Sequence, residues 1–225
     1  MSLARKHWNP QSLNSYRGYY PVVEGVACYK EGIEFSVDLP ADDPDVLSDV
    51  YMYEANVWPP KDIPGALEFK NYILNYYASM SEVGLTITRM LAIGLGKEEK
   101  YFDELFVNKP LSTLRLMHYP VRPQPIPESA KKDGLVLTCL EHTDSTFMAL
   151  LSTFDYEGLQ IMLKDGSWVD VEVRPDCLVM NAGDALIKTT GQFKATRHRV
   201  VDYGKERYSR SILYRALLLW RYWPV

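Results

Sequence analysis

Glu141-His142-Thr143-Asp144 is the stretch on which the interpretation of this chain depends. It ends an apolar run, 134–142, that is typical of a β-strand. Residues two apart on a strand point to the same side, so His142 and Asp144 can bind one ion from a single strand end. Fifty-three residues separate Asp144 from His198, enough for several strands that return His198 to the same point. Two histidines and one carboxylate form the triad that holds a ferrous ion and leaves its opposite face free.

A second signal follows on the next predicted strand, where Arg207 and Ser209 stand two residues apart. An arginine fork with a neighbouring hydroxyl is suited to binding a carboxylate. Taken alone, His142 is more simply interpreted as an ordinary strand histidine, and Arg207 as a solvent-exposed arginine. The two signals together favour a metal site with a carboxylate site one strand away.

Composition excludes several classes of function. Of the 225 residues, 47% are hydrophobic and 24% charged, and the net charge of -4 argues against a nucleic-acid partner. No run is long and apolar enough to span a membrane, and the start lacks a secretory pattern. The cysteines, Cys28, Cys139 and Cys177, form neither a zinc spacing nor a disulfide framework, so we expect a reducing, cytoplasmic location. Cys139 and Cys177 lie in apolar runs and are expected to be buried.

The chain is expected to form one domain with three successive parts. Residues 1–65 have little periodicity and many proline, aspartate and glycine residues, which predicts a loop-rich segment. Residues 66–106 predict helical backing, with an apolar stripe over 66–94 and a shorter helix at 98–105. Residues 107–225 predict the β-rich core. We therefore expect an α+β, mainly β fold with helices packed on one face.

Short apolar stretches separated by turn residues predict the strands of this core. The expected strands are 112–119, 134–142, 147–153, 158–163, 168–173, 177–180, 185–188, 193–201 and 208–219.

Residues 111–214 also resemble a known family. The matching pieces, in order, are Leu114-Arg115-Leu116-Met117-His118-Tyr119-Pro120, His142-Thr143-Asp144, Gly158-Leu159-Gln160, Asp165-Gly166-Ser167-Trp168, Asn181-Ala182-Gly183-Asp184, His198-Arg199-Val200 and Arg207-Tyr208-Ser209. In this order they resemble the catalytic core of the non-haem iron(II), 2-oxoglutarate-dependent dioxygenases, in the isopenicillin N synthase-like branch. The resemblance implies a double-stranded β-helix, or jelly roll, backed by helices on its major sheet.

The resemblance also implies roles for individual residues. His142, Asp144 and His198 fall on the iron ligands, Arg207 and Ser209 on the pair that binds the distal carboxylate of 2-oxoglutarate, and Tyr119 on a tyrosine that assists. The implied cofactors are iron(II), 2-oxoglutarate as cosubstrate and dioxygen, with ascorbate as an optional reductant.

Three other positions complete this comparison. Met117 stands where many members carry asparagine. His118 is expected to point to the opposite face from Tyr119 and to be structural. Gly183 and Asp184 are expected to form a turn that fixes the sheet geometry.

The implied function is oxidation of a small organic substrate, by hydroxylation or desaturation, with release of succinate and carbon dioxide. Two alternatives are an iron oxidase of the same family that does not use 2-oxoglutarate, and a non-catalytic jelly roll that binds a ligand or partner. The first alternative stays open because the Arg-x-Ser pair also occurs in such oxidases, and two departures from the family support the second. Members usually carry roughly a hundred more N-terminal residues, and the tail after Ser209 lacks the usual Pro-Phe-Phe pattern.

Overall fold

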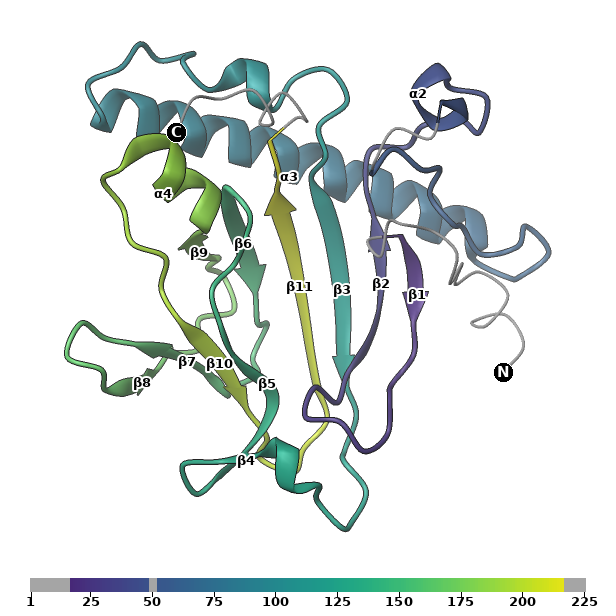
Figure 1. Ribbon diagram of the computed structural model, residues 1–225. Coiled ribbons are helices and arrows are strands. Elements are labelled where there is room, and N and C mark those ends of the chain that lie inside the picture. Colours follow the sequence, from purple (N-terminus) through teal and green to yellow (C-terminus); the bar gives the residue numbers. More distant parts are fainter. Residues whose placement is uncertain (1–16, 49–51, 217–225) are drawn as a thin grey trace. The chain divides into compact units, whose positions relative to one another are not determined.

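The computed structural model describes residues 17–48 and 52–216 and has the mainly β architecture expected from the sequence (Figure 1). One sheet has six strands in the order β1-β2-β3-β11-β6-β9, and a second has five in the order β4-β5-β10-β7-β8. The strands are β1 (Gly18–Tyr20), β2 (Glu31–Phe35), β3 (Thr113–Tyr119), β4 (Lys131–Lys132), β5 (Leu135–His142), β6 (Met148–Ser152), β7 (Leu159–Met162), β8 (Trp168–Asp170), β9 (Val179–Ala182), β10 (His198–Val201) and β11 (Arg207–Tyr214). The helices are α2 (Pro44–Leu47), α3 (Ala66–Gly94) and α4 (Asp184–Thr190), with 3-10 turns η1 (Asp103–Leu105) and η2 (Glu128–Ala130).

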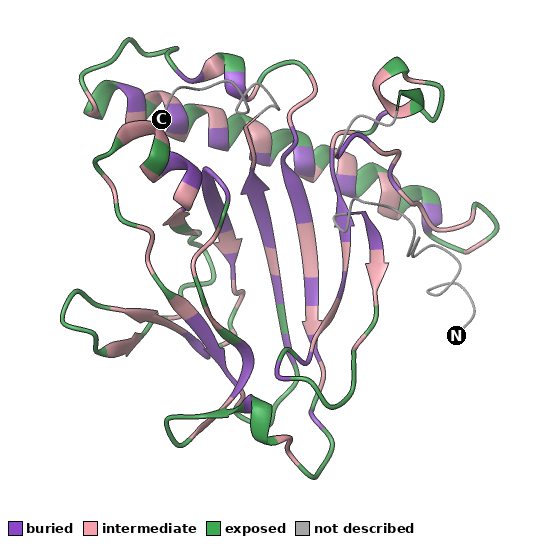
Figure 2. Cartoon of the chain, in the orientation of Figure 1, coloured by how far each residue is buried: buried purple, intermediate pink, exposed green. Residues whose placement is uncertain are grey.

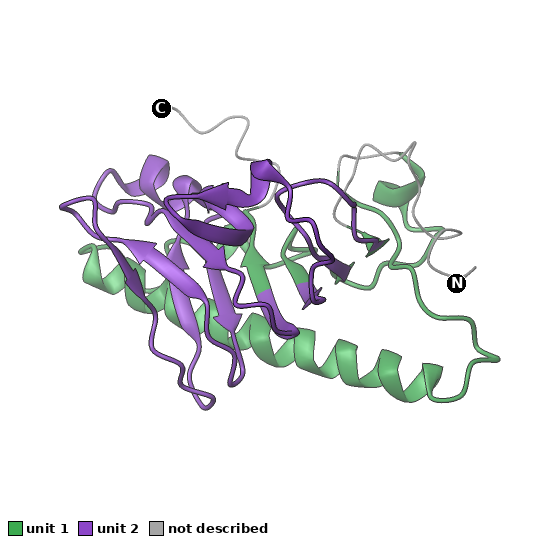
Figure 3. Cartoon of the chain, turned by 90° about the horizontal axis from the view of Figure 1, so that it is seen from below, with its two compact units in different colours: residues 1–19, 34–114, 212–225 green, residues 20–33, 115–211 purple. Residues whose placement is uncertain are grey.

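The chain divides into two compact units (Figure 3). The first consists of residues 1–19, 34–114 and 212–225, and the second of residues 20–33 and 115–211. All six residues of the predicted metal and carboxylate sites belong to the second unit.

In the first unit, α3 confirms the helix expected at 66–94, and one stripe of it is buried (Figure 2). The buried positions include Met80, Gly84, Thr88 and Ala92. They are four residues apart, close to the 3.6 residues of one helical turn, so they lie on one face of the helix. A side chain at Gly84 would overlap the ring of Tyr214, whose hydroxyl donates a hydrogen bond to the Met80 carbonyl. The glycine therefore allows this tyrosine to lie against the helix.

The segment expected to be loop-rich, residues 1–65, also contains regular elements that were not predicted. Two strands, β1 and β2, and the short helix α2 lie in this segment, while residues 1–16 and 49–51 fall outside the described chain. The sequence of β2, Glu31-Gly32-Ile33-Glu34-Phe35, has a glycine and two acids, which are poor strand formers. Pairing with neighbouring strands overrides this weak local preference.

The strand expected at 185–188 is also wrong, because these residues lie in α4. A four-residue apolar run fits a buried strand and a helix turn equally well. Gly183 precedes the helix, and Gly191 ends it in the left-handed conformation with φ of 68°. The shorter helix expected at 98–105 is reduced to the 3-10 turn η1.

Candidate metal centre and carboxylate site

His142 and His198 lie directly opposite each other on neighbouring antiparallel strands. The register of β5 and β10 pairs His198 with His142, and their ring centroids are 4.2 Å apart. Asp144 follows two residues after the end of β5, and its Oδ1 atom lies 3.9 Å from His142 Nε2 and 3.8 Å from His198 Nε2. The structure therefore brings the three predicted residues together at the end of one strand pair.

The donor atoms of this group suit a divalent metal ion. The two imidazole nitrogens and the carboxylate oxygen all lie within 4.8 Å of one another. Separations of 3.8 and 3.9 Å are too long for hydrogen bonds, so neither ring ties up the Oδ1 atom of Asp144. Imidazole and carboxylate ligands in a set of three match the facial triad of ferrous iron.

Backbone carbonyls orient both rings. The Nδ1 atom of His142 lies 2.8 Å from the Leu140 carbonyl, and that of His198 lies 3.2 Å from the Thr196 carbonyl. Each Nδ1–H therefore donates to a carbonyl, which leaves the Nε2 lone pair directed at Asp144. Burial lowers the pKa of His198, and this effect outweighs the opposing influence of Asp144. The ring is consequently held in the neutral form that a metal requires.

Asn181 and the start of α4 fix the position of Asp144. The Asn181 side-chain amide donates to Asp144 Oδ2 over 2.7 Å, and the Asp184 backbone N–H donates to the Asp144 carbonyl over 2.8 Å. A side chain at Gly183 would overlap the Thr146 carbonyl. The segment from Asp144 to Thr146 can therefore lie this close to the start of α4 only because residue 183 is a glycine. Gly183 and Asp184, expected to form a turn that fixes the sheet geometry, instead begin α4: Gly183 precedes the helix and Asp184 is its first residue. The contacts of Asn181 and Asp184 with Asp144 were not predicted, because only tertiary structure brings these segments together.

The predicted carboxylate site lies at the start of β11. Arg207 and Ser209 are only 6% and 3% exposed, yet Arg207 Nη1 and Ser209 Oγ are buried without a hydrogen-bond partner. The Arg207 Nε–H donates to the Glu157 carbonyl over 3.1 Å, and the guanidinium lies 4.9 Å from the centre of the Tyr119 ring. Among the described residues, no acid forms an ion pair with Arg207. A buried cation beside a free hydroxyl matches an anionic ligand.

Tyr119 is close to this site but its hydroxyl has only a weak partner. The hydroxyl donates to the Met117 sulfur over 3.4 Å, and both residues are buried. A thioether is a poor acceptor, so a ligand carboxylate would compete for the same hydroxyl.

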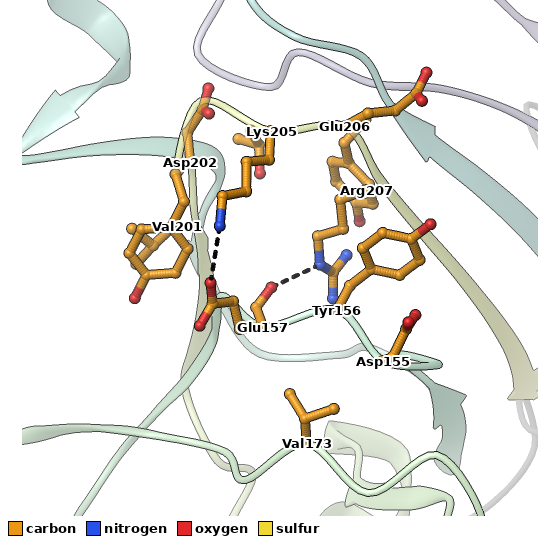
Figure 4. Close-up of a pocket in the computed structure, with 12 residues that line it drawn as sticks. Asp155, Tyr156, Glu157, Val173, Val201, Asp202, Lys205, Glu206 and Arg207 are labelled. Carbon is orange, nitrogen blue, oxygen red and sulfur yellow. Dashed lines mark hydrogen bonds and ion pairs between the residues drawn. The ribbon is translucent and has the colours of Figure 1, made fainter.

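A cavity of about 480 Å³ is lined by Arg207 and Tyr119 (Figure 4). Figure 4 shows Glu157 at this cavity: its carboxylate pairs with Lys205, and its backbone carbonyl accepts a hydrogen bond from Arg207. His142, Asp144 and His198 are not among the lining residues, so the cavity reaches the guanidinium rather than the triad.

His118 belongs to a different cluster. Its ring nitrogens lie 2.8 Å from Glu31 and 2.8 Å from Glu206, and its ring stacks on Tyr208 at 4.6 Å. Desolvation lowers the pKa of His118, but the two carboxylates outweigh it and raise the pKa above its ordinary value. This histidine links carboxylates at the surface, in agreement with its expected structural role.

None of the helices in residues 17–48 and 52–216 combines the length and the apolar composition that a bilayer-spanning helix requires.

Known proteins resemble this chain in sequence and in structure. The 2-oxoglutarate-dependent dioxygenase citB of Monascus ruber is 33% identical over 219 residues, covering 93% of this chain and 65% of citB. Isopenicillin N synthase of Streptomyces clavuligerus is 28% identical over 209 residues, covering 92% of this chain and 63% of the synthase. The crystal structure of Neurospora crassa T7H with alpha-KG and 5-formyluracil superposes with a TM-score of 0.73 and 27% identity, covering 94% of this chain and 63% of T7H.

The chain therefore spans less than two thirds of the length of these relatives. The family model of the 2OG-Fe(II) oxygenase superfamily matches residues 110–216, which include all six predicted site residues. This chain belongs to the 2OG-Fe(II) oxygenase superfamily.

Proposed function

We propose that this chain catalyses the iron(II)- and 2-oxoglutarate-dependent oxidation of a small organic molecule, with release of succinate and carbon dioxide. The observation that carries the proposal is the convergence of His142, Asp144 and His198 within 4.8 Å. The unpartnered Arg207 and Ser209 atoms supply a fitting carboxylate site in the same unit.

In this proposal, His142, Asp144 and His198 would hold the iron, since the two Nε2 atoms face Asp144 Oδ1. The bound iron, with dioxygen and 2-oxoglutarate, supplies the oxidative chemistry, and the protein supplies binding and orientation. Asn181 holds the second carboxylate oxygen of Asp144, so that Oδ1 remains directed at the ion.

The cosubstrate site would be formed by Arg207, Ser209 and Tyr119. Arg207 offers a buried N–H and Ser209 a buried hydroxyl to the distal carboxylate of 2-oxoglutarate. Tyr119 would release the Met117 sulfur and donate to the same group. Because these donors are fixed on β3 and β11, they would orient the cosubstrate before the reaction begins.

A small molecule is the substrate class that we propose, without a nucleic-acid or membrane partner. T7H, which is similar over most of this chain, has been crystallised with alpha-KG and a single modified nucleobase. The net charge of -4 is a further argument against a polyanionic substrate.

The test is succinate production from labelled 2-oxoglutarate by the iron-loaded chain, measured with oxygen uptake across a panel of small organic acids, phenols and nucleobases. We expect at least one compound to stimulate succinate release, and Asp144→Ala to abolish it. Asp176→Ala, which removes an exposed carboxylate outside the site, should retain the activity.

Two results would contradict the proposal. Substrate-dependent oxygen uptake without succinate would identify an iron oxidase that does not use 2-oxoglutarate. Absence of metal uptake by the folded chain would instead identify a non-catalytic binding protein.

A further inference from the structure

The helix α3 has a second stripe of uncharged side chains besides the buried one. At 3.6 residues per turn, this stripe lies on roughly the opposite face from Met80 and Gly84, so exposed and buried positions alternate along the helix (Figure 2). We call it the outer stripe. Its members recur at alternating spacings of four and three residues, and all except the half-buried Tyr76 are exposed: Tyr72, Tyr76, Ser79, Val83, Thr86, Met90 and Ile93.

The outer stripe has the spacing of a contact between two helices. Steps of four and three average 3.5 residues, the repeat at which two helices stay in contact along their length. Residues 72–93 extend over about 33 Å, which is three such repeats. Large apolar members of the stripe are well exposed, with Met90 at 66% and Ile93 at 59%. Isolated apolar side chains are normal on a surface, but a row of them in this register indicates a partner helix.

The charges beside the outer stripe are opposite in sign. Glu82 and Arg89 stand seven residues apart on one flank of it, at the positions from which paired helices exchange ion pairs. Arg89 binds Asp103 through Nε and Nη2, and within residues 17–48 and 52–216 no hydrogen bond occupies its Nη1. Nor does an ion pair in that part of the chain use the Glu82 carboxylate. Each of the two can therefore bind an opposite charge on another helix.

An antiparallel second copy matches the stripe and its flank together. With a two-fold axis near residue 85, Val83 of one copy lies against Thr86 of the other, and Ser79 lies against Met90, a small side chain opposite a long one. Glu82 of each copy then faces Arg89 of the other, which gives two equivalent ion pairs. The surface is thus complementary to itself, which favours a second copy of this chain over an unrelated helix.

We propose that α3 packs antiparallel against α3 of a second copy of this chain, with the two outer stripes forming a two-fold interface. All of the residues involved belong to the first unit, whereas the candidate metal and carboxylate sites belong to the second. The proposal is therefore independent of the proposed function and can fail or succeed without it.

Sedimentation velocity of the full, folded chain over a wide range of concentrations tests this interface. We expect a reversible equilibrium between monomer and dimer. Val83→Glu and Met90→Glu should each abolish the dimer, because a carboxylate would be buried against apolar atoms. Leu67→Glu is the matched control, since Leu67 is 72% exposed on the same helix but lies off the outer stripe; this variant should still dimerise. Circular dichroism verifies that each variant is folded.

An exchange of charges tests the identity of the partner and its direction. Glu82→Arg should weaken the dimer because the new arginine would face Arg89 of the other copy, and Arg89→Glu should weaken it by the same kind of repulsion. An equimolar mixture of these two variants should restore the dimer, as a heterodimer identified by native mass spectrometry. Asp103→Asn removes only the partner of Arg89 within its own chain, so this variant should dimerise like the unaltered protein.

Four results would overturn the proposal. A monomer at every concentration would show that α3 does not pair. A dimer that persists in both Val83→Glu and Met90→Glu would use a different surface. A mixture of the charge variants that associates no better than either alone would exclude the antiparallel pairing. A monomer in which Met90 resists oxidation by peroxide would show that another segment of this chain covers the stripe.

Discussion

Replacement of Arg207 by methionine should separate ligand binding from stability. The guanidinium is buried, its Nη1 amino group has no hydrogen-bond partner, and it pairs with no acid among the described residues. Truncating one partner of a buried, hydrogen-bonded charge pair costs about 2–5 kcal/mol of binding free energy. Arg207→Met should therefore raise the dissociation constant for 2-oxoglutarate by roughly 30- to 4,000-fold.

The same change should leave the free protein stable. A buried charge without a counter-ion opposes folding, because its desolvation is not offset by an ion pair. The free energy of unfolding of Arg207→Met, measured without ligand, should consequently be unchanged or increased. Arg207→Lys keeps the charge but loses the planar fork. Its affinity for 2-oxoglutarate should therefore lie between that of the unaltered protein and that of Arg207→Met.

The assay is an anaerobic titration of the iron-loaded protein with 2-oxoglutarate, followed by visible absorbance, together with urea unfolding of the metal-free protein. Arg174→Met is the control, because Arg174 pairs with Glu172 on the exposed surface and its loss removes the same charge. If Arg207→Met unfolded more easily but bound 2-oxoglutarate normally, Arg207 would be a structural residue and the reasoning would be refuted.

Three further predictions follow from contacts outside the ligand atoms. Asn181→Ala should weaken iron(II) binding by roughly 10- to 100-fold, measured by competition with a chelator, because Asp144 loses its side-chain anchor; unchanged affinity would show that the anchor is dispensable. Since the pKa of His118 is raised, its contribution to stability is complete below about pH 6.5 and is lost as pH rises through the raised value. The free energy of unfolding, measured with urea, should therefore be lower at about pH 8.5 than at about pH 6, and His118→Gln should reduce this difference. An equal difference in both proteins would contradict this. Gly84→Ala should destabilise the protein by about 1–3 kcal/mol through overpacking, whereas Gly94→Ala, which meets no atom within 4 Å, should not; equal thermal shifts would refute the packing argument.

The meeting of the three candidate metal ligands was predictable from the sequence for a simple physical reason. The alternation of side chains along a strand places His142 and Asp144 at one strand end, and an antiparallel partner can return His198 to it. The structure confirms that these residues meet. Arg207 and Ser209 were likewise predicted as a pair, and both are buried on the same strand.

The parts that escaped prediction depend on tertiary contacts. His142 pairs with His198, and Cys139 pairs with Val200. Between these two pairs β5 has a step of three residues and β10 a step of only two, so the register is irregular. Such an irregularity re-aims side chains, and no local signal in the apolar run reveals it. Asn181 contacts Asp144 from another segment of the chain, so its role emerges only when the strands are assembled. Cys177, expected from its apolar run to be buried, is exposed for the same reason: burial is decided by tertiary packing.

Metal stoichiometry tests the central claim most directly. Elemental analysis of the folded chain after anaerobic iron(II) loading and desalting should give one iron per chain for the unaltered protein. Separate replacements of His142, Asp144 and His198 by alanine should each remove it, while Asp176→Ala retains it. Iron retained in all three alanine variants, or absent from the unaltered protein, would contradict the account.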